Sequence, residues 1–271
     1  MTPQVFDAFR RLVYREAGIA LRESKSALVT ARIARRMREL GLEDAGEYLR
    51  YVEADGDGAE LVLFLDSITT NFTSFFRESD HFQVLADEVR SALAGGKNSF
   101  RVWCAAAATG EEPYTLAMTL NEALLGSGAD FRILATDLSQ RALRFAEEGR
   151  YPESRLAQVP ARLRQRYFKQ ESRASRDEAW FRVAPELRER IVFGRLNLAT
   201  PPFPLRGELD VVFCRNVMIY FDGEVRRRLV GEIERLTRVG GLFVVAHAET
   251  LGRTRGSFRA IHASAYRKAA A

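Results

Sequence analysis

The stretch that decides the fold is residues 100–114, which read FRVWCAAAATGEEPY. The first five residues of this stretch are typical of a β-strand. The alanines and Gly110 that follow favour a turn where a ligand can approach the backbone closely, and Pro113 suits the first turn of a helix. A strand, a turn of small residues and a helix in this order indicate the start of an open α/β sheet.

Similar β-rich runs recur downstream, separated by segments long enough for a helix. They comprise residues 131–135, 190–193, 209–214 and 241–246, and the run 258–266 is suited to an added edge strand. Strands separated in this way predict crossover connections and a mostly parallel sheet covered on both faces. The polar stretch 170–182 breaks the pattern, and we interpret it as a small excursion from the sheet.

Upstream of this region the chain has a different, helical pattern. Apolar residues recur at helical spacing in two places, at Val5, Phe6, Phe9, Leu12 and Val13 and at Leu61, Phe64, Leu65 and Ile68. No alternating strand pattern is convincing there. The sequence therefore predicts a small all-α N-terminal domain with an interdomain linker at residues 1–78, followed by an α/β domain at residues 79–271.

Composition places the chain among ordinary globular proteins. Its 271 residues are 46% hydrophobic and 28% charged, which excludes disordered and fibrous classes. It has no apolar run of the ~20 residues that span a bilayer, and its first residues do not have a signal-peptide pattern. We therefore expect a cytoplasmic protein with no membrane insertion.

The cysteines and histidines do not have the spacing of a metal site. Cys104 and Cys214 each end an apolar run and are interpreted as small buried hydrophobes. The histidines are at positions 81, 247 and 262, far from zinc-ligand spacing. The sequence predicts no metal.

Acidic residues at the start of the first α/β helix restrict the ligand. Glu111 and Glu112 follow the small-residue turn, and the G-x-G-x-x-G spacing of dinucleotide sites is absent. Carboxylates there repel a pyrophosphate and suit a cationic ligand. Acidic residues are also common at helix starts because they complement the helix dipole, so both interpretations stay open.

Two further strand ends carry polar residues. Asp137 follows the second strand, where an acidic residue binds ribose hydroxyls in such folds; the alternative is a helix cap shared with Ser139. The fourth strand runs into Arg215, Asn216 and Tyr220, which need polar partners if they are buried. An acidic residue for the ribose, an acidic pair and no phosphate-binding motif together favour a nucleoside with an amino-acid-like cationic tail. S-adenosylmethionine fits this description better than a dinucleotide.

Four motifs make the chain resemble the CheR family of chemotaxis-receptor methyltransferases over nearly its whole length. They are residues 68–78 (ITTNFTSFFRE), 101–114, 135–137 and 213–221 (FCRNVMIYF). The resemblance implies a helical domain on a Rossmann-like methyltransferase domain and S-adenosylmethionine as methyl donor. It also implies that glutamates on the cytoplasmic helices of methyl-accepting chemotaxis receptors become methyl esters.

The resemblance also implies roles for individual residues. Asn71, Thr73 and Arg77 would face the cofactor and the reacting carboxylate, with Arg77 orienting that carboxylate and Tyr220 positioning it beside the transferred methyl group. The remaining cofactor residues are Glu112 with Glu111 for the ammonium group, Asp137 for the ribose, Asn197 and Leu198 for the adenine, and Arg215 and Asn216 closing the site.

The chain departs from the family pattern in two places. The usual Gly-His-Ser-Glu is Ala246-His247-Ala248-Glu249, and Cys104 replaces a common serine. We expect neither departure to touch the cofactor residues.

A basic helix is predicted between Val29 and Leu40, with Arg32, Arg35 and Arg36 on one face. Such a face is usually solvated, but glutamate-rich receptor helices would be attracted to it, so these arginines are candidate substrate-binding residues.

Two other functions compete with receptor methylation. A net charge of +5 suits a nucleic-acid methyltransferase, although the basic residues are dispersed and no aromatic-studded basic groove is visible, so we expect no nucleic-acid partner. The other alternative is a non-catalytic cofactor-binding scaffold. The chain retains every site residue carried over from the family, which argues against this alternative.

Overall fold

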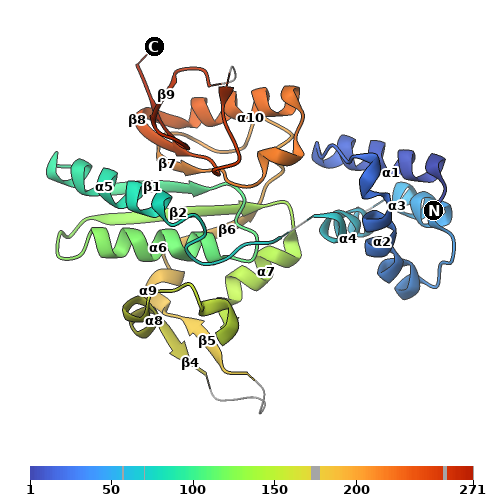
Figure 1. The fold of residues 1–271 in the computed structure, drawn as a ribbon, viewed down its shortest axis with the longest axis horizontal. Coiled ribbons are helices and arrows are strands. Elements are labelled where there is room, and N and C mark those ends of the chain that lie inside the picture. The colour runs from blue at the N-terminus through green and yellow to red at the C-terminus, as the bar shows by residue number, and fades with distance from the viewer. Residues whose placement is uncertain (57, 70, 172–177, 253–254, 271) are drawn as a thin grey trace.

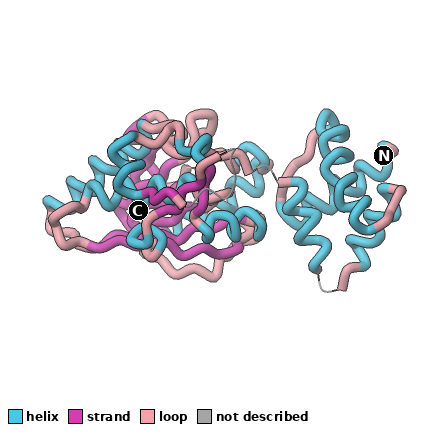
Figure 2. Tube along the Cα trace, turned by 90° about the horizontal axis from the view of Figure 1, so that it is seen from below, coloured by secondary structure: helices cyan, strands magenta, loops and turns pink. Residues whose placement is uncertain are grey.

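The computed structural model describes residues 1–56, 58–69, 71–171, 178–252 and 255–270. Figure 1 shows a helical unit formed by the N-terminal residues beside a larger α/β unit, and the two are equally distinct in the perpendicular view of Figure 2. None of the helices described has the length and apolar character needed to cross a membrane.

The N-terminal unit is helical, as predicted. Thr2 caps its first helix and Pro3 begins it, an arrangement that suits a helix start. The rings of Phe9, Tyr48 and Phe64 meet in its core, with centroids 5.4–6.2 Å apart. The helices are α1 (Pro3–Ala17), η1 (Glu23–Lys25), α2 (Ser26–Leu40), α3 (Ala45–Ala54) and α4 (Ala59–Ile68).

Residues 69 and 71–79, between α4 and α5 (Asp80–Ala94), are not part of a helix or strand. Phe76 and Glu78 in this segment have φ angles of 55°, an uncommon conformation for residues other than glycine. Helix α5 packs against the α/β core through Phe82, Leu85 and Val89. A domain boundary after Glu78 stays a prediction.

The α/β unit contains a seven-stranded sheet in the order β6-β2-β1-β7-β8-β10-β9. The first five strands of that order are parallel to one another, and β10 pairs antiparallel with both of its neighbours, β8 and β9. The fold class predicted from the sequence is confirmed. The elements are β1 (Ser99–Cys104), α6 (Glu111–Ala123), β2 (Asp130–Asp137), α7 (Gln140–Glu148), β6 (Ile191–Arg195), β7 (Leu209–Phe213), η3 (Met218–Tyr220), α10 (Gly223–Leu236), β8 (Thr237–Val244), β9 (Phe258–His262) and β10 (Ala265–Lys268).

The register brings three strand ends together, since Cys104 at the end of β1 pairs with Ala135 of β2 and with Phe213 of β7. Cys104 and Cys214 are both buried, as predicted. The run expected as one edge strand is instead a hairpin, because the turn at Ala263 and Ser264 folds the chain back so that β10 pairs with β8.

A second, three-stranded antiparallel sheet has the order β3-β5-β4 and lies to one side of the main sheet (Figure 1). It contains the described ends of the predicted excursion at 170–182, while residues 172–177 lie outside the described part of the chain. Strands of three or four residues are too short for an alternating pattern to be recognised. The elements are β3 (Arg150–Pro152), η2 (Glu153–Leu156), α8 (Ala161–Tyr167), β4 (Phe168–Gln170), β5 (Trp180–Val183) and α9 (Pro185–Arg188).

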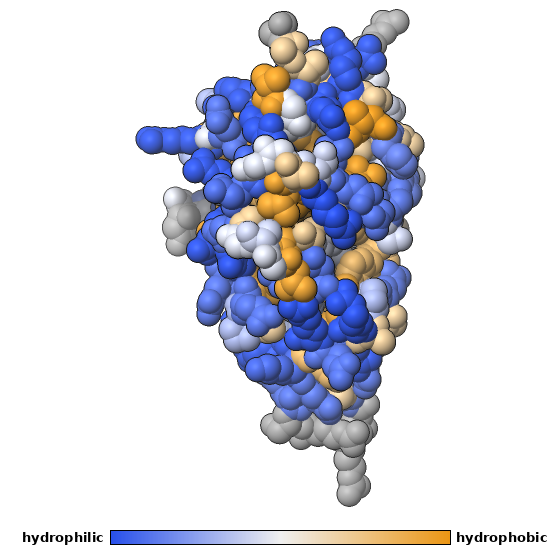
Figure 3. All heavy atoms as spheres, turned by 90° about the vertical axis from the view of Figure 1, so that its left-hand side faces the viewer, coloured by the Kyte–Doolittle hydropathy of each residue, from blue (hydrophilic) through white to orange (hydrophobic). Residues whose placement is uncertain are grey.

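The end of the α/β unit that faces away from the helical unit has a mostly hydrophilic surface with scattered hydrophobic patches (Figure 3). Its opposite end, toward the helical unit, contains the cavity described next.

Candidate active site

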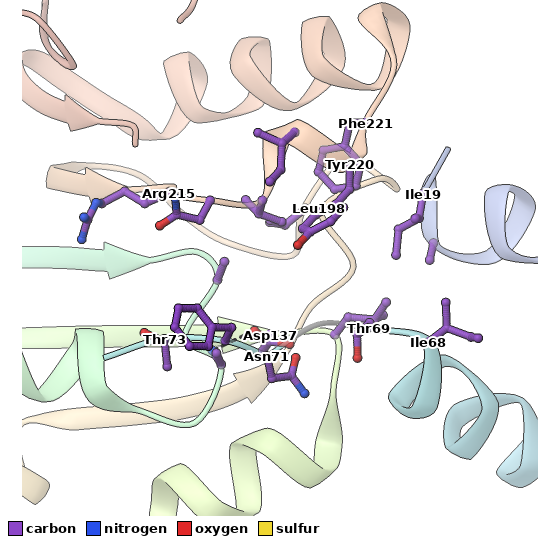
Figure 4. Close-up of a pocket in the computed structure, with 18 of the residues that line it drawn as sticks. Ile19, Ile68, Thr69, Asn71, Thr73, Asp137, Leu198, Arg215, Tyr220 and Phe221 are labelled. Carbon is purple, nitrogen blue, oxygen red and sulfur yellow. Dashed lines mark hydrogen bonds between the residues drawn. The ribbon is translucent and has the colours of Figure 1, made fainter. Parts of the chain in front are cut away.

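A cavity of about 430 Å³ lies at the carboxyl ends of β1, β2 and β7, where ligands bind in open α/β sheets. Figure 4 shows Asp137, Asn71 and Thr73 along one side of it and Leu198 and Tyr220 across from them. The helical unit closes the remaining side with residues of its own: Ala17, Ile19, Leu21, Leu28, Arg32 and Ile68. The cavity therefore lies between the two units.

The turn after β1 leaves space for a ligand because its side chains are small. Ala105, Ala106 and Ala108 line the cavity. Gly110 has a φ of 97°, and a Cβ at this position would lie 2.6 Å from the Tyr151 hydroxyl oxygen. A side chain at this position would clash, and a positive φ is strained for most other residues. The turn from β1 into α6 therefore requires glycine here.

Asp137 both lines the cavity and fixes the turn. Its carboxylate accepts hydrogen bonds from the backbone N–H groups of Ala108 and Ser139, each at 2.9 Å. Desolvation raises the pKa of Asp137, and these hydrogen bonds oppose the rise. Ser139, not Asp137, is the N-cap of α7, where it accepts from Ala142. The helix-cap alternative for Asp137 is therefore not what the structure shows.

The two adjacent glutamates have separate environments. Glu112 lines the cavity. Glu111 is outside the described lining and is buried, with Arg155 and Thr109 at 2.8 and 2.7 Å from its carboxylate. Burial raises the pKa of both carboxyls. Our expectation that Glu111 helps to hold the cofactor is not met by this geometry, because neighbouring helical residues point about 100° apart.

Arg215 lines the cavity beside Glu112, as predicted, and its buried guanidinium has hydrogen-bond partners on both terminal nitrogens. Its Nη1 donates to Glu112 Oε2 at 2.8 Å, and its Nη2 donates to Glu78 Oε2 at 3.0 Å and to the Arg77 carbonyl at 2.6 Å. Glu78 was not among the residues predicted from the sequence. The guanidinium thus joins the interdomain segment to the start of α6.

The expectation that the departures from the family pattern avoid the cofactor residues is wrong for Cys104. Its Sγ lies 3.3 Å from Glu112 Oε1 and donates to it. The cysteine is the last residue of β1, and the turn that follows brings Glu112 back to it. A contact of this kind depends on the fold and has no signal in sequence spacing.

Glu249 holds the loop after β7. Its carboxylate accepts from the N–H groups of Asn216 at 3.0 Å, Ala246 at 3.0 Å and Ile219 at 3.3 Å. Asn216 has a φ of 58°, so the loop needs such support. Asn216 and Tyr220, both on the cavity, are positioned by a residue that the sequence prediction left unassigned.

The remaining predicted residues also line the cavity: Asn71, Thr73, Arg77, Asn197, Leu198 and Tyr220. The Arg77 guanidinium lies 5.5 Å from the ring centroid of Phe72 and donates to the Phe72 carbonyl at 3.0 Å. Asn197 Nδ2 donates to the carbonyl of Glu16 at 2.7 Å, which ties the α/β unit to α1. This interdomain role was not predicted.

The three arginines of α2 differ in their surroundings. Arg32 lines the cavity and donates to the carbonyls of Ile68 and Thr69. Arg36 is bound to the buried Glu60, with Nε 3.0 Å from Oε1, whereas the exposed Arg35 pairs with Glu39 at 3.0 Å. Part of the predicted basic face is therefore neutralised within the domain.

The fold also assembles a cluster that sequence spacing did not suggest. Ligand-type atoms of Glu78, His81 and His247 all lie within 4.8 Å of one another. The Glu78 carboxylate already accepts from Arg215 and from the His247 N–H at 3.0 and 3.1 Å. Burial lowers the pKa of His81 to about 4. We interpret the cluster as an extension of the Arg215 network.

Two family profiles together match most of the chain. The family profile described as "CheR methyltransferase, all-alpha domain" matches residues 4–69, and that described as "CheR methyltransferase, SAM binding domain" matches residues 71–267. Chemotaxis protein methyltransferase 2 of Pseudomonas aeruginosa is 40% identical over 265 residues, which cover 98% of this chain and 93% of the relative.

The chemotaxis protein methyltransferase of Escherichia coli is 37% identical, over 93% of this chain and 86% of the relative. A solved geranyl diphosphate methyltransferase in complex with S-adenosylmethionine is far less similar, at 16% identity over 71% of this chain and 54% of that one, with a TM-score of 0.34. The chain belongs to the CheR family of S-adenosylmethionine-dependent chemotaxis protein-glutamate methyltransferases.

Proposed function

We propose that this cavity holds S-adenosylmethionine between Glu112 and Asp137 and transfers its methyl group to glutamates on the cytoplasmic helices of chemotaxis receptors. The observation that carries the proposal is the pair of buried or half-buried carboxylates on one cavity, Glu112 at the start of α6 and Asp137 at the end of β2. Asp137 would accept from the ribose hydroxyls, and Glu112 from the methionine ammonium.

The donor set fits this cofactor. The turn Ala105–Ala108 brings backbone rather than side chains to the cavity, so an adenosine can lie against it. Leu198 supplies an apolar wall for a base, and Asn197 lies next to it. When bound, S-adenosylmethionine supplies an electrophilic methyl group on a sulfonium sulfur.

The protein's task is then mainly to position the reacting groups. A glutamate has an ordinary pKa of about 4.3, so the accepting carboxylate is already ionised at neutral pH and needs no general base. Arg77, half-buried at the cavity, would orient the carboxylate, and Tyr220 across the cavity would position it by hydrogen bonding. Closure of the cavity by the helical unit would limit the access of water.

The helical unit would bind the receptor. Arg22, Lys25 and Arg32 line its side of the cavity, and Arg35 is exposed on the same helix as Arg32. Together with the exposed Phe72 and Ile219 at the cavity, they suit an acidic helix with an apolar stripe. The protein would act in the cytoplasm, where these receptor helices lie.

A methyl-transfer assay tests the proposal. The purified protein would be incubated with methyl-tritiated S-adenosylmethionine and the cytoplasmic fragment of a chemotaxis receptor. Label that is released by base as methanol, and is lost when the accepting glutamates are replaced by alanine, supports ester formation at those glutamates. Label that resists base, or no label on any receptor fragment while the cofactor still binds, contradicts the proposed acceptor.

A further inference from the structure

Arg215 is shared between two carboxylates, only one of which lines the cavity. Glu112 lines it, while Glu78 approaches the guanidinium from the interdomain segment. A fully buried guanidinium needs a negative partner, because an unpaired buried charge is strongly unfavourable. The bonds to Glu78 and Glu112 at 3.0 and 2.8 Å meet that need.

The proposed role of Glu112 creates a competition. If Glu112 were the only carboxylate beside Arg215, the guanidinium and the cofactor ammonium would be drawn to the same group. The Glu112 carboxylate is crowded already, since Oε2 accepts from Arg215 and Oε1 accepts from Cys104. A second carboxylate on Arg215 lessens this competition.

Glu78 is held where it can serve this purpose. Its Oε2 also accepts from the His247 N–H at 3.1 Å, and its backbone has the uncommon φ of 55°. Burial acts to raise the pKa of Glu78, but Arg215 and the His247 N–H outweigh it, so the pKa is lowered and the group stays ionised at neutral pH.

We propose that Glu78 is a positioning residue that acts through Arg215: as the counter-ion of the guanidinium, it leaves Glu112 available to bind the ammonium group of the cofactor. The inference rests on the proposed function, since it takes Glu112 to be the ammonium-binding residue. Glu78 itself does not need to touch the cofactor.

Two ligands separate this role from general support of the fold. S-adenosylhomocysteine carries the ammonium group, whereas 5′-methylthioadenosine keeps the adenosine and the sulfur but lacks the amino-acid end. Glu78→Gln preserves the shape of the side chain and removes its charge, so Arg215 is expected to draw Glu112 toward itself. Calorimetric titration should show about a tenfold loss of affinity for S-adenosylhomocysteine, with the affinity for 5′-methylthioadenosine unchanged.

Equal losses for the two ligands would mean that Glu78 merely supports the fold, and unchanged affinities would mean that Arg215 does not need it; either result overturns the inference. Glu88→Gln on α5, which removes an ion pair with Arg267, is the matched control and should change neither affinity. If Glu78→Gln does not fold, Glu78→Asp, which keeps the negative charge one methylene further from Arg215, takes its place. It should retain most of the preference for S-adenosylhomocysteine over 5′-methylthioadenosine, and loss of that preference would mean that the length of the side chain rather than its charge is required, which overturns the inference.

Glu112→Gln tests the proposed binding of the ammonium group by Glu112 separately from the role of Glu78. It should abolish most of the preference for S-adenosylhomocysteine over 5′-methylthioadenosine. If it does not, the ammonium group lies elsewhere and both proposals fail. If Glu112→Gln removes the preference but Glu78→Gln does not, only the role of Glu78 is wrong.

Discussion

The two sides of the cavity are built differently. On the sheet side, Asp137 and Glu112 are held by backbone N–H groups, a cysteine and a buried arginine. On the helical side, Arg22, Lys25 and Arg32 line the cavity, Arg35 is exposed on the same helix as Arg32, and Phe72 of the adjoining interdomain segment presents exposed apolar surface. The difference suits a small cofactor that needs a preorganised site and a large receptor helix that is attracted by surface charge. Changes on the sheet side should therefore act on cofactor affinity, and changes on the helical side on the receptor.

The largest effect is expected at Asp137. Asp137→Ala removes the carboxylate proposed to accept from both ribose hydroxyls, and hydrogen bonds to a charged group are worth about 1.5–3 kcal/mol each. We expect the affinity for S-adenosylhomocysteine to fall by roughly a hundredfold or more in calorimetric titration. Asp130→Asn, at the other end of β2, is the matched control. Binding within a few-fold of the wild type would remove Asp137 from the cofactor site.

Arg77 lies in the interdomain segment, between the sheet side and the helical side of the cavity. It therefore tests most directly whether effects on cofactor affinity and effects on the receptor can be separated. Arg77→Ala should lower kcat for receptor methylation by about 10–100-fold, as expected for the loss of one orienting contact in a reaction governed by alignment. The affinity for S-adenosylhomocysteine should fall much less. Steady-state kinetics at saturating receptor measure the first quantity. Wild-type turnover would show that Arg77 does not orient the carboxylate, and an equal loss of cofactor affinity would place it on the cofactor side only.

Within the helical side, Arg36 should matter for stability rather than for receptor binding. It is bonded to Glu60, which is buried and also accepts from the Tyr48 hydroxyl at 2.8 Å. Arg36→Ala leaves a buried carboxylate without its cation, and we expect a loss of about 2 kcal/mol in the free energy of unfolding. Urea denaturation measures it. A loss below about 0.5 kcal/mol, the range of ordinary surface substitutions, would return Arg36 to the candidate receptor-binding face.

The sheet side was more predictable from the sequence than the helical side, for a physical reason. Asp137 and Glu112 each follow a strand or a strand–turn within one continuous motif, and parallel strands end at the same edge, so a pattern along the chain predicts proximity in space. The same pattern could not separate Glu111 from Glu112, because a rotation of one residue along α6 decides which of them lines the cavity.

Contacts between distant segments left no such signal. Glu78 meets Arg215 across 137 positions of sequence, and Asn197 meets Glu16 across 181. Each is an ordinary polar residue in its own neighbourhood, and only tertiary packing gives it a partner. The sequence could not distinguish the roles of Arg32, Arg35 and Arg36 for the same reason. The position of Glu60 opposite α2 depends on how α4 packs.

Arg35 should show the smallest effect and the one most specific to the receptor. Its side chain is 75% exposed and, among the residues that the structure describes, pairs at the surface with Glu39 alone, so Arg35→Glu should leave folding and the affinity for S-adenosylhomocysteine unchanged. If an acidic receptor helix passes this face, reversing the charge should raise KM for the receptor by about threefold to tenfold at low salt. The effect should shrink as salt screens the interaction, since the screening length falls from about 30 Å at 0.01 M to about 8 Å at 0.15 M. Arg90→Glu on α5, outside the cavity lining and likewise in a surface pair, makes the same charge change and serves as the control. Equal effects from the two variants would mean that overall charge draws the receptor, whereas an effect confined to Arg35 assigns the attraction to α2.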